Sequence, residues 1–307
     1  MTALLRARHA RIDADDGRRL EGLDFVIDAA WRVSLVGDFA PLWLWLLGAA
    51  RLEQGSLSLS GLEGRAALAA GLFGMAPRTW LQPGALNGRE LLERSTRLLP
   101  PLGKPPRQLA REALSRLGAE ALTSRRLRHM NAGERRVLAL SHALLGEPRG
   151  IFVEEPFFGL SAAEEPYVLE ALERAAASTA VIVALGPLPT AGAARAWLER
   201  SERVLVASRQ TVVADGSFSE LSAPAERYRV VVGRRASRFV AALAERGISA
   251  HSAISASVPV TDERPVELWV SVGAEQGTRP LLEAALQAEA PLREVEADPL
   301  MVLNRPP

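Results

Sequence analysis

The fold is decided by the stretch MNAGERRVLALSHALLGEPRGIFVEEPFFGLS, which occupies residues 130–161. Apolar residues recur at helical spacing over 132–145, and the apolar run at 150–153 is typical of a buried strand. A second helical pattern covers 162–177, and a second buried run covers 180–185. Helices that alternate with buried strands predict a parallel sheet with crossover helices, so we expect an α/β fold.

The same alternation begins near the N-terminus. Apolar side chains alternate or cluster over 4–12 and 23–27, and residues 32–36 form a buried run that ends at Gly37. We expect a helix from Pro41 to Leu52, because proline suits the first helical position. A strand followed by a glycine, a short loop and a helix is the geometry of a phosphate-binding loop.

Two other parts of the chain have a different character. Residues 85–130 have helical leucine spacing and little strand pattern, which predicts a helical insertion in a first domain at 1–222 that closes with a hairpin at 203–214. From 227 to 307 the order strand, helix, strand, strand, helix, strand predicts a small ferredoxin-like α/β domain. Its expected strands are 227–232, 250–257, 266–272 and 293–297, and its expected helices are 237–246 and 279–289.

Composition limits the function. With 37 basic and 36 acidic side chains, the chain has no overall field that would steer it to nucleic acid or anionic lipid, so partners must be recognised locally. Cysteine is absent and the four histidines lack metal-ligand spacing, so we expect no metal site. The N-terminal residues do not form a secretory signal, and the longest apolar run, Phe39–Ala50, has 12 residues where a bilayer requires ~20. We expect a cytoplasmic protein with at most a peripheral membrane role.

The segment after Val36 lacks the chemistry of a phosphate-binding loop. Such a loop reads G-x-x-x-x-G-K-[ST], so that backbone amides and a lysine surround the phosphates, whereas residues 37–44 read GDFAPLWL. The only lysine, Lys104, lies in a proline-rich turn of the helical segment. Taken alone, residues 37–44 do not form a motif.

The order of five landmarks nevertheless resembles that of the ATPase subunits of ABC transporters. They are the post-helix hairpin at 53–57, the segment ending in the lid glutamine at 74–78, the signature sequence at 130–136, the Walker B strand at 151–156 and the domain end at 216–221. The resemblance implies the ABC-type P-loop NTPase fold with a helical subdomain at about 85–130. The C-terminal region resembles the small domain of many ABC-2 type exporter ATPases, including an acidic, leucine-rich close at 298–303.

Compared with that family, the residues that hold ATP are missing. The phosphate lysine maps to Trp43 and the Mg²⁺-binding hydroxyl maps to Leu44, while Gly37 is kept. Pro41 removes a backbone amide, and Asp38 places a carboxylate where an anion should bind. We interpret these residues as a degenerate Walker A loop. The two tryptophans at 43 and 45 have a simpler explanation as core aromatics that fill the vacated volume.

The contacts outside the loop are also changed. The lid glutamine maps to Arg78, the Walker B aspartate to Glu154 and the switch histidine to Gly186. Glu155 keeps the catalytic carboxylate position, but without a bound substrate we expect it to be vestigial. We therefore expect no cofactor at the chain's own site and no ATPase activity of the chain alone.

The signature-like turn is less altered. Asn131, Ala132, Gly133 and Glu134 stand before a helix and allow backbone amides to face an anion. In the family, each ATP lies between one cassette's loop and the other's signature sequence. The resemblance thus implies a non-hydrolysing subunit of a bacterial exporter, peripheral at the inner face of the membrane, that pairs with an active ABC ATPase and ABC-2 type permease subunits and shares ATP and Mg²⁺ with that ATPase.

Two other functions stay open. The chain could be a soluble scaffold or regulatory protein with the cassette fold, or a weak ATPase with an altered loop. The arginines at 125, 126 and 128, with His129, either contact a partner's carboxylates or phosphates or form a solvated charged face. Direct nucleotide titration separates the weak ATPase from the others.

Overall fold

The computed structural model describes residues 3–28, 32–79, 84–101, 103–208, 210–221, 225–252, 264–273 and 277–297. The chain forms two compact units, Met1–Phe218 and Ser219–Pro307. The sequence analysis placed the break a few residues later, between 222 and 227. The acidic close at 298–303 lies outside the described residues.

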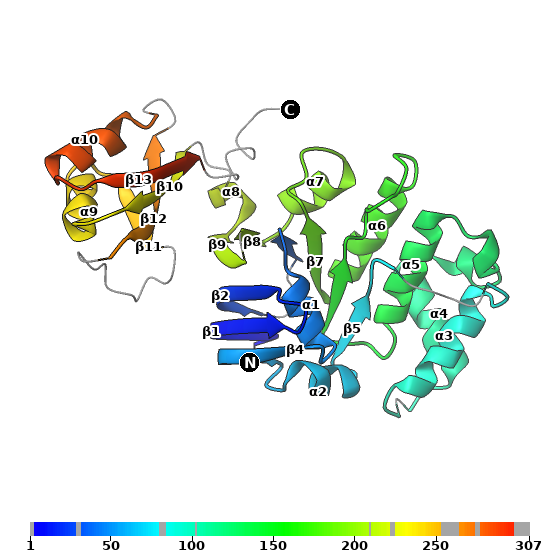
Figure 1. Cartoon of the computed structure of the whole chain (residues 1–307). Coiled ribbons are helices and arrows are strands. Elements are labelled where there is room, and N and C mark those ends of the chain that lie inside the picture. Colours follow the sequence, from blue (N-terminus) through cyan, green and yellow to red (C-terminus); the bar gives the residue numbers. More distant parts are fainter. Residues whose placement is uncertain are drawn as a thin grey trace. The chain divides into compact units, whose positions relative to one another are not determined.

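The first unit is built on a nine-stranded sheet with the order β4-β1-β2-β9-β8-β3-β7-β6-β5 (Figure 1). Strands β8, β3, β7, β6 and β5 are parallel, whereas β1 is antiparallel to its two neighbours, β4 and β2. The predicted α/β class is confirmed. The strands are β1 Leu5–Ala14, β2 Arg19–Ile27, β3 Arg32–Val36, β4 Ala50–Leu59, β5 Phe73–Ala76, β6 Gly150–Glu154, β7 Ala180–Gly186, β8 Arg203–Ser208 and β9 Thr211–Gly216.

The helices of this unit connect the parallel strands and form a lobe beside β5. Figure 1 shows α3, α4 and α5 gathered in that lobe. Between 84 and 130 the described residues contain α3, α4 and three 3₁₀ turns. The helices are α1 Ala40–Leu46, α2 Gly64–Ala69, α3 Gly88–Ser95, α4 Pro106–Arg116, α5 Ala132–Ala143, α6 Glu165–Ala176 and α7 Gly192–Glu199, and the 3₁₀ turns are Thr96–Leu98, Glu120–Leu122 and Leu127–His129. The short helix α8 Phe218–Leu221 spans the boundary between the two units.

The expected helix from Pro41 to Leu52 is wrong at its C-terminal end. Helix α1 ends at Leu46, and β4 begins at Ala50. Gly48 has φ +75°, its amide donates to the Trp45 carbonyl, and the Ala49 amide donates to the Leu44 carbonyl. This pair of hydrogen bonds around a left-handed glycine ends the helix, although the apolar sequence continues.

Helix α5 packs very closely on β5. A Cβ atom at Gly74 of β5 would collide with the backbone carbonyl of Ala143 at the end of α5. Glycine is therefore required at this crossing, since any side chain would push the helix away from the sheet. The crossing fixes the position of α5, whose other end carries the signature-like turn.

The second unit has a four-stranded antiparallel sheet with the order β11-β12-β10-β13. Its helices contribute Phe239, Leu243 and Leu281 to a core with Val230 and Val270 of the sheet. The expected strand at 250–257 continues beyond the described residues. The elements follow as β10 Ala225–Val232, α9 Ala236–Ala244, β11 Ser249–Ser252, β12 Val266–Gly273, α10 Arg279–Gln287 and β13 Leu292–Ala297.

Among the residues that the structure describes, no helix combines the length and the apolar character needed to cross a membrane.

Candidate functional site

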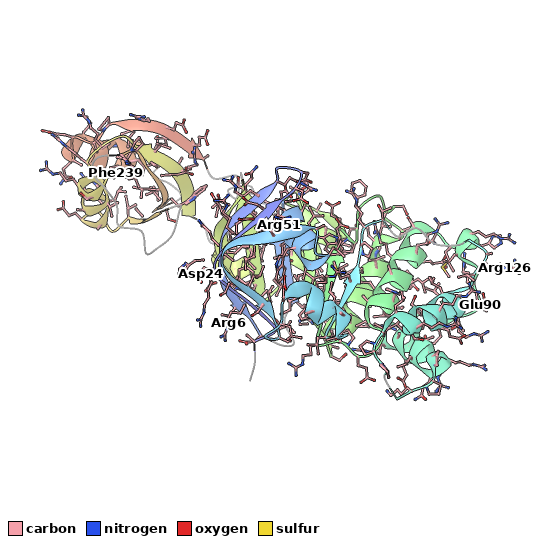
Figure 2. The ribbon with its side chains drawn as sticks, turned by 60° about the horizontal axis from the view of Figure 1, so that its bottom comes forward. Arg6, Asp24, Arg51, Glu90, Arg126 and Phe239 are labelled. Carbon is pink, nitrogen blue, oxygen red and sulfur yellow. The ribbon has the colours of Figure 1, made fainter. Side chains whose placement is uncertain are left out.

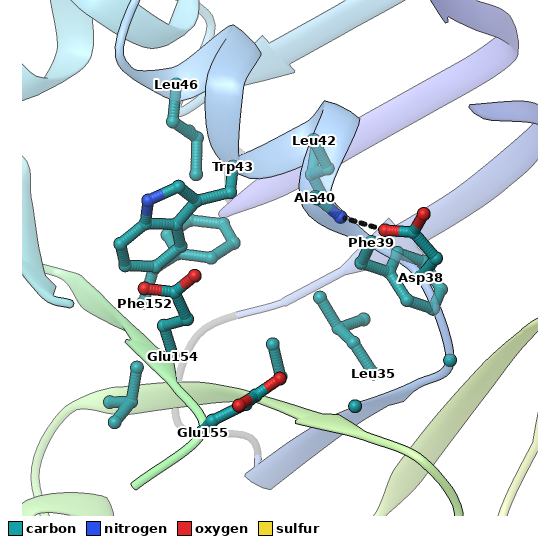
Figure 3. Close-up of a pocket in the computed structure, with 14 residues that line it drawn as sticks. Leu35, Asp38, Phe39, Ala40, Leu42, Trp43, Leu46, Phe152, Glu154 and Glu155 are labelled. Atoms are coloured by element: carbon teal, nitrogen blue, oxygen red, sulfur yellow. Dashed lines mark hydrogen bonds between the residues drawn. The ribbon is translucent and has the colours of Figure 1, made fainter. Parts of the chain in front are cut away.

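The loop between β3 and α1 is closed by its own residues. Gly37 has φ +101°, and its amide donates to the Gly186 carbonyl at 2.6 Å. A Cβ atom at this position would collide with the Ala207 carbonyl oxygen, so the glycine is required by the neighbouring strand β8. The Asp38 carboxylate accepts a hydrogen bond from the Ala40 amide at 3.0 Å (Figure 3). The first amide of α1 is thus bound by the chain's own anion.

A small pocket lies beside this loop. Its volume is about 80 Å³, and its walls come from the loop, α1 and the C-terminal ends of β6 and β7. Trp43 is half-buried, and Figure 3 shows its indole beside Phe152 and next to Glu154. Trp45 is 3% exposed and belongs to the core, as its interpretation as a core aromatic predicted. Small-molecule sites usually measure ~300–1,000 Å³, so this pocket does not have the size of a nucleotide site.

The residues present do not fit a magnesium-bound triphosphate at this loop. No lysine or arginine lines the pocket, whereas Asp38, Glu154 and Glu155 place three carboxylates in its wall. Leu44 has no hydroxyl, and Pro41 has no amide. Among the described residues, no group of three or more His, Cys, Asp and Glu side chains is arranged to hold a metal ion.

Arg78 contacts both carboxylates at the end of β6. Its guanidinium Nη1 lies 3.0 Å from Glu155 Oε2, and its backbone amide donates to Glu154 Oε2 at 2.9 Å. The guanidinium also lies over the Phe158 ring, 4.7 Å from its centroid. Because β5 and β6 are neighbours in the sheet, Arg78, two residues beyond the end of β5, reaches the residues at the end of β6.

A second guanidinium supports this arrangement from α5. Arg136 donates to the backbone carbonyls of Pro77 and Arg78, and to that of Phe158 at 3.4 Å. Burial lowers the pKa of Arg136, with the charge of Arg78 acting in the same direction and the carboxylates of Glu154 and Glu155 acting against it. Arg78 and Arg136 therefore form one cluster with Glu154 and Glu155.

The side chain of Glu155 occupies the space beside Gly186. Gly186 has φ +62°, and a Cβ atom on it would lie 2.8 Å from Glu155 Oε1. Glu155 itself has φ +40°, a backbone conformation that is uncommon for a residue with a side chain. The switch position therefore has no room for a histidine while Glu155 keeps this orientation.

The signature-like turn is a helix N-terminus with a complete capping box. The Asn131 side-chain oxygen accepts from the Glu134 amide at 2.8 Å, and Glu134 Oε2 accepts from the Asn131 amide at 2.9 Å. The other Glu134 oxygen pairs with Arg125 at 3.0 Å. This pairing assigns Arg125 a partner within the chain, and the box explains why α5 begins at Ala132.

The anion beside this turn is the chain's own Glu164. The Gly133 amide donates to Glu164 Oε1 at 3.2 Å, and Ser161 donates its amide and hydroxyl to Oε2 at 3.0 and 2.8 Å. These hydrogen bonds, first those from Ser161, hold the pKa of the Glu164 carboxyl below its usual value. Gly133 is buried against Glu164, whereas Asn131 and Ala132 are exposed.

The structure thus brings together Asp38, Trp43, Glu154, Glu155 and Gly186 around one pocket, while Asn131, Ala132, Gly133 and Glu134 form a separate turn. The sequence analysis missed the roles of Arg136 and Glu164. A signal for the latter was available, because Ser161 and Glu164 have the S-x-x-E spacing of a capping box before the helical pattern at 162–177.

Comparisons with known proteins identify the fold of the chain. No protein-family model and no curated protein matches it. Among solved structures, it is similar to the ADP conformation of an ATP-binding cassette of an ABC transporter, with 15% identity over 71% of this chain and 92% of that one and a TM-score of 0.58. It is also similar to cbiO1 from Clostridium perfringens, part of the ABC transporter complex cbiONQ, with 16% identity over 72% and 91% and a TM-score of 0.61.

A bacterial Atm1-family ABC exporter with ATP bound is similar at 17% identity, over 71% of this chain and 39% of that chain, with a TM-score of 0.55. These likenesses define the class of fold as a P-loop NTPase. More closely, the chain has the fold of the ATP-binding cassettes of ABC transporters, as the sequence predicted.

Proposed function

We propose that this chain is a pseudo-ATPase, a nucleotide-binding-domain subunit of a bacterial ABC exporter that does not hydrolyse ATP at its own site. The observation that carries the proposal is the pocket beside α1, where Trp43 and three carboxylates stand in place of cationic phosphate contacts. The Ala40 amide, which a phosphate would need, is bound by Asp38.

The missing contacts are large enough to decide between binding and no binding. A hydrogen bond to a charged group contributes ~1.5–3 kcal/mol, so loss of the lysine, the hydroxyl and one amide weakens affinity by roughly three to six decades. The carboxylate of Asp38 adds repulsion toward a phosphate at the same place. We expect the isolated chain to bind ATP no more tightly than the millimolar range.

The proposal includes an active ABC ATPase as partner, ABC-2 type permease subunits, and a peripheral position at the inner face of the membrane. Two of the similar structures are described as part of a transporter complex and as an exporter. The exposed Asn131 and Ala132 at the start of α5 are the residues through which this chain would meet the partner's ATP. Glu164 would then yield its hydrogen bond with Gly133 to a phosphate oxygen.

Calorimetric titration of the isolated chain with Mg²⁺ and ATP tests whether its own site binds ATP. An intact cassette is titrated alongside as the control. We expect no heat of binding at micromolar ATP. Micromolar affinity, or ATP turnover that the Glu155→Gln variant abolishes, would identify a working altered loop and contradict the proposal.

The test of the shared ATP site requires this chain assembled as a pair with an intact cassette. Ala132→Arg puts bulk on an exposed position of the signature-like turn and should abolish ATP hydrolysis while the pair still forms. Glu155→Gln changes a carboxylate that Arg78 already neutralises, so hydrolysis by the pair should continue. If Ala132→Arg leaves the rate unchanged, the shared site is wrong. Failure to pair with any intact cassette would favour the scaffold or regulatory protein.

A further inference from the structure

One part of this chain carries a clear excess of positive charge. Between residues 84 and 130 there are ten arginines and lysines and four glutamates, although the whole chain carries a net charge of only +1. The remainder of the chain is therefore net acidic. These 47 residues belong to the lobe formed by α3, α4 and the start of α5, and Figure 2 shows Arg126 at the outer end of that lobe.

A pocket in this lobe is lined by three guanidinium groups. Arg89 of α3 and Arg107 and Arg111 of α4 line a cavity of about 370 Å³ with Thr123 and Leu114, and we call it the arginine pocket. Its volume lies in the usual range for ligand sites. Arg107 and Arg111 are exposed, stand one helical turn apart and form no salt bridge with the described residues. The nitrogen of Arg89 lies 3.6 Å from Glu93, beyond hydrogen-bond distance.

The far end of α3 carries an exposed apolar side chain between further cations. Leu98 is 85% exposed, which makes it the most exposed large apolar side chain among the described residues. Arg94 and Arg97 border the shallow hollow beside it, and neither forms a salt bridge with a residue that the structure describes. We call residues 94–98 the α3 tip. An exposed leucine beside arginines combines burial of apolar area with attraction to anionic lipids, the two contributions that bind proteins at a membrane interface.

We propose that the helical lobe binds the surface of an anionic phospholipid membrane, with a headgroup phosphate in the arginine pocket and Leu98 in the interface. Guanidinium groups bind phosphate oxygens in pairs, and Arg107 and Arg111 form no salt bridge with the residues that the structure describes. Leu98 supplies the apolar contact that a soluble phosphate would not require. The excess of positive charge on this lobe favours its approach to the negative surface.

The first experiment is co-sedimentation of the full chain with vesicles of phosphatidylcholine mixed with phosphatidylglycerol, and with vesicles of phosphatidylcholine alone. We expect binding to the mixed vesicles only, and weaker binding as salt rises, because the headgroup charge is screened. Equal binding to both kinds of vesicle, or to neither, would overturn the proposal. No partner subunit is present, so the result does not depend on the proposed pairing.

Two double variants distinguish binding at the arginine pocket from a general effect of positive charge. Each arginine near an anionic surface changes the partition coefficient about fivefold, so Arg107→Gln with Arg111→Gln should weaken binding about 25-fold. The matched control is Arg6→Gln with Arg51→Gln, which removes two exposed arginines of β1 and β4 and should leave binding nearly unchanged. Equal losses in the two double variants would overturn the assignment of the pocket.

The α3 tip and the source of the phosphate have their own controls. Leu98→Ser should weaken vesicle binding several-fold, whereas Leu286→Ser, which changes a leucine 79% exposed in the second unit, should not. Inorganic phosphate should compete with the vesicles only weakly. If phosphate displaces the chain fully at low millimolar concentration, or if Leu98→Ser has no effect, the pocket is a soluble-anion site and the membrane proposal fails.

Discussion

The guanidinium of Arg78 lies 3.0 Å from the carboxylate of Glu155. In the resemblance described above, the sequence analysis assigned Arg78 to the lid glutamine position and Glu155 to the catalytic carboxylate position. The protein itself thus supplies a cation beside two adjacent glutamates, through the Arg78 guanidinium at Glu155 and the Arg78 amide at Glu154.

Arg78→Gln should lower the free energy of unfolding by up to about 1 kcal/mol, because the ion pair with Glu155 is partly exposed. The loss should shrink at high salt, where the pair is screened. Urea denaturation at low and high salt measures both effects. Arg51→Gln, which removes an exposed arginine without a salt bridge to the described residues, is the control and should change neither. An equal loss at both salts would contradict an electrostatic role.

Gly186→Ala should destabilise the chain through two separable effects. One is the left-handed backbone at φ +62°, which costs about 1–2 kcal/mol for a residue with a side chain, and the other is the collision with Glu155. Gly159→Ala isolates the first effect, since Gly159 has φ +72° and open space around it. In a Glu155→Ala background the collision disappears, so Gly186→Ala should there cost no more than Gly159→Ala. A double-mutant cycle without coupling would disprove the contact.

Glu164→Ala should expose the amide of Gly133. That amide now donates to Glu164, so its hydrogen exchange should accelerate in the variant. The lowered pKa of Glu164 means that its contribution to stability is present above the unfolded pKa and is lost as the pH falls through the folded value. Glu170→Ala, which removes a partner of Arg174 on the same helix, is the control and should leave the Gly133 amide protected. Unchanged exchange in Glu164→Ala would refute the contact.

His142 should make the stability of the chain depend on pH in the acid range. Burial in α5 lowers its pKa from 6.5 to about 4, so the folded state keeps it neutral while the unfolded state takes up a proton. The free energy of unfolding should be fully retained above about pH 6.5 and fall by roughly 2–3 kcal/mol toward pH 4. His142→Gln should remove this part of the pH dependence. Denaturation curves at several pH values give the comparison.

The sequence predicted the parallel part of the sheet well because buried strands and crossover helices differ in period. It failed at the end of α1, where the apolar run from Leu42 to Leu47 has no polar break and only Gly48 marks the stop. Helix α7, Gly192–Glu199, was not predicted either. Its eight residues are rich in alanine and give few periodic positions to count.

The candidate site was predicted in its membership but not in its contacts. Family positions identified Arg78, Glu154, Glu155 and Gly186, and the structure places these four residues around the ends of β5, β6 and β7. The pairing of Arg78 with Glu155 joins residues 77 apart in the chain, so it follows from strand order rather than from local spacing. The hydrogen bond between Glu164 and Gly133 could not be predicted from local spacing either, because Gly133 lies on another helix.

The close crossing of α5 on β5 at Gly74 has a mechanical consequence. Helix α5 is about 18 Å long, with the exposed Asn131 at its N-terminal end and Ala143 packed against the sheet at its C-terminal end. Between these ends, Arg136 donates hydrogen bonds to the backbone carbonyls of Pro77 and Arg78. Under the proposed pairing, a displacement of the Asn131 end would reach Pro77 and Arg78, and the carboxylate that Arg78 pairs with, through contacts within this chain alone.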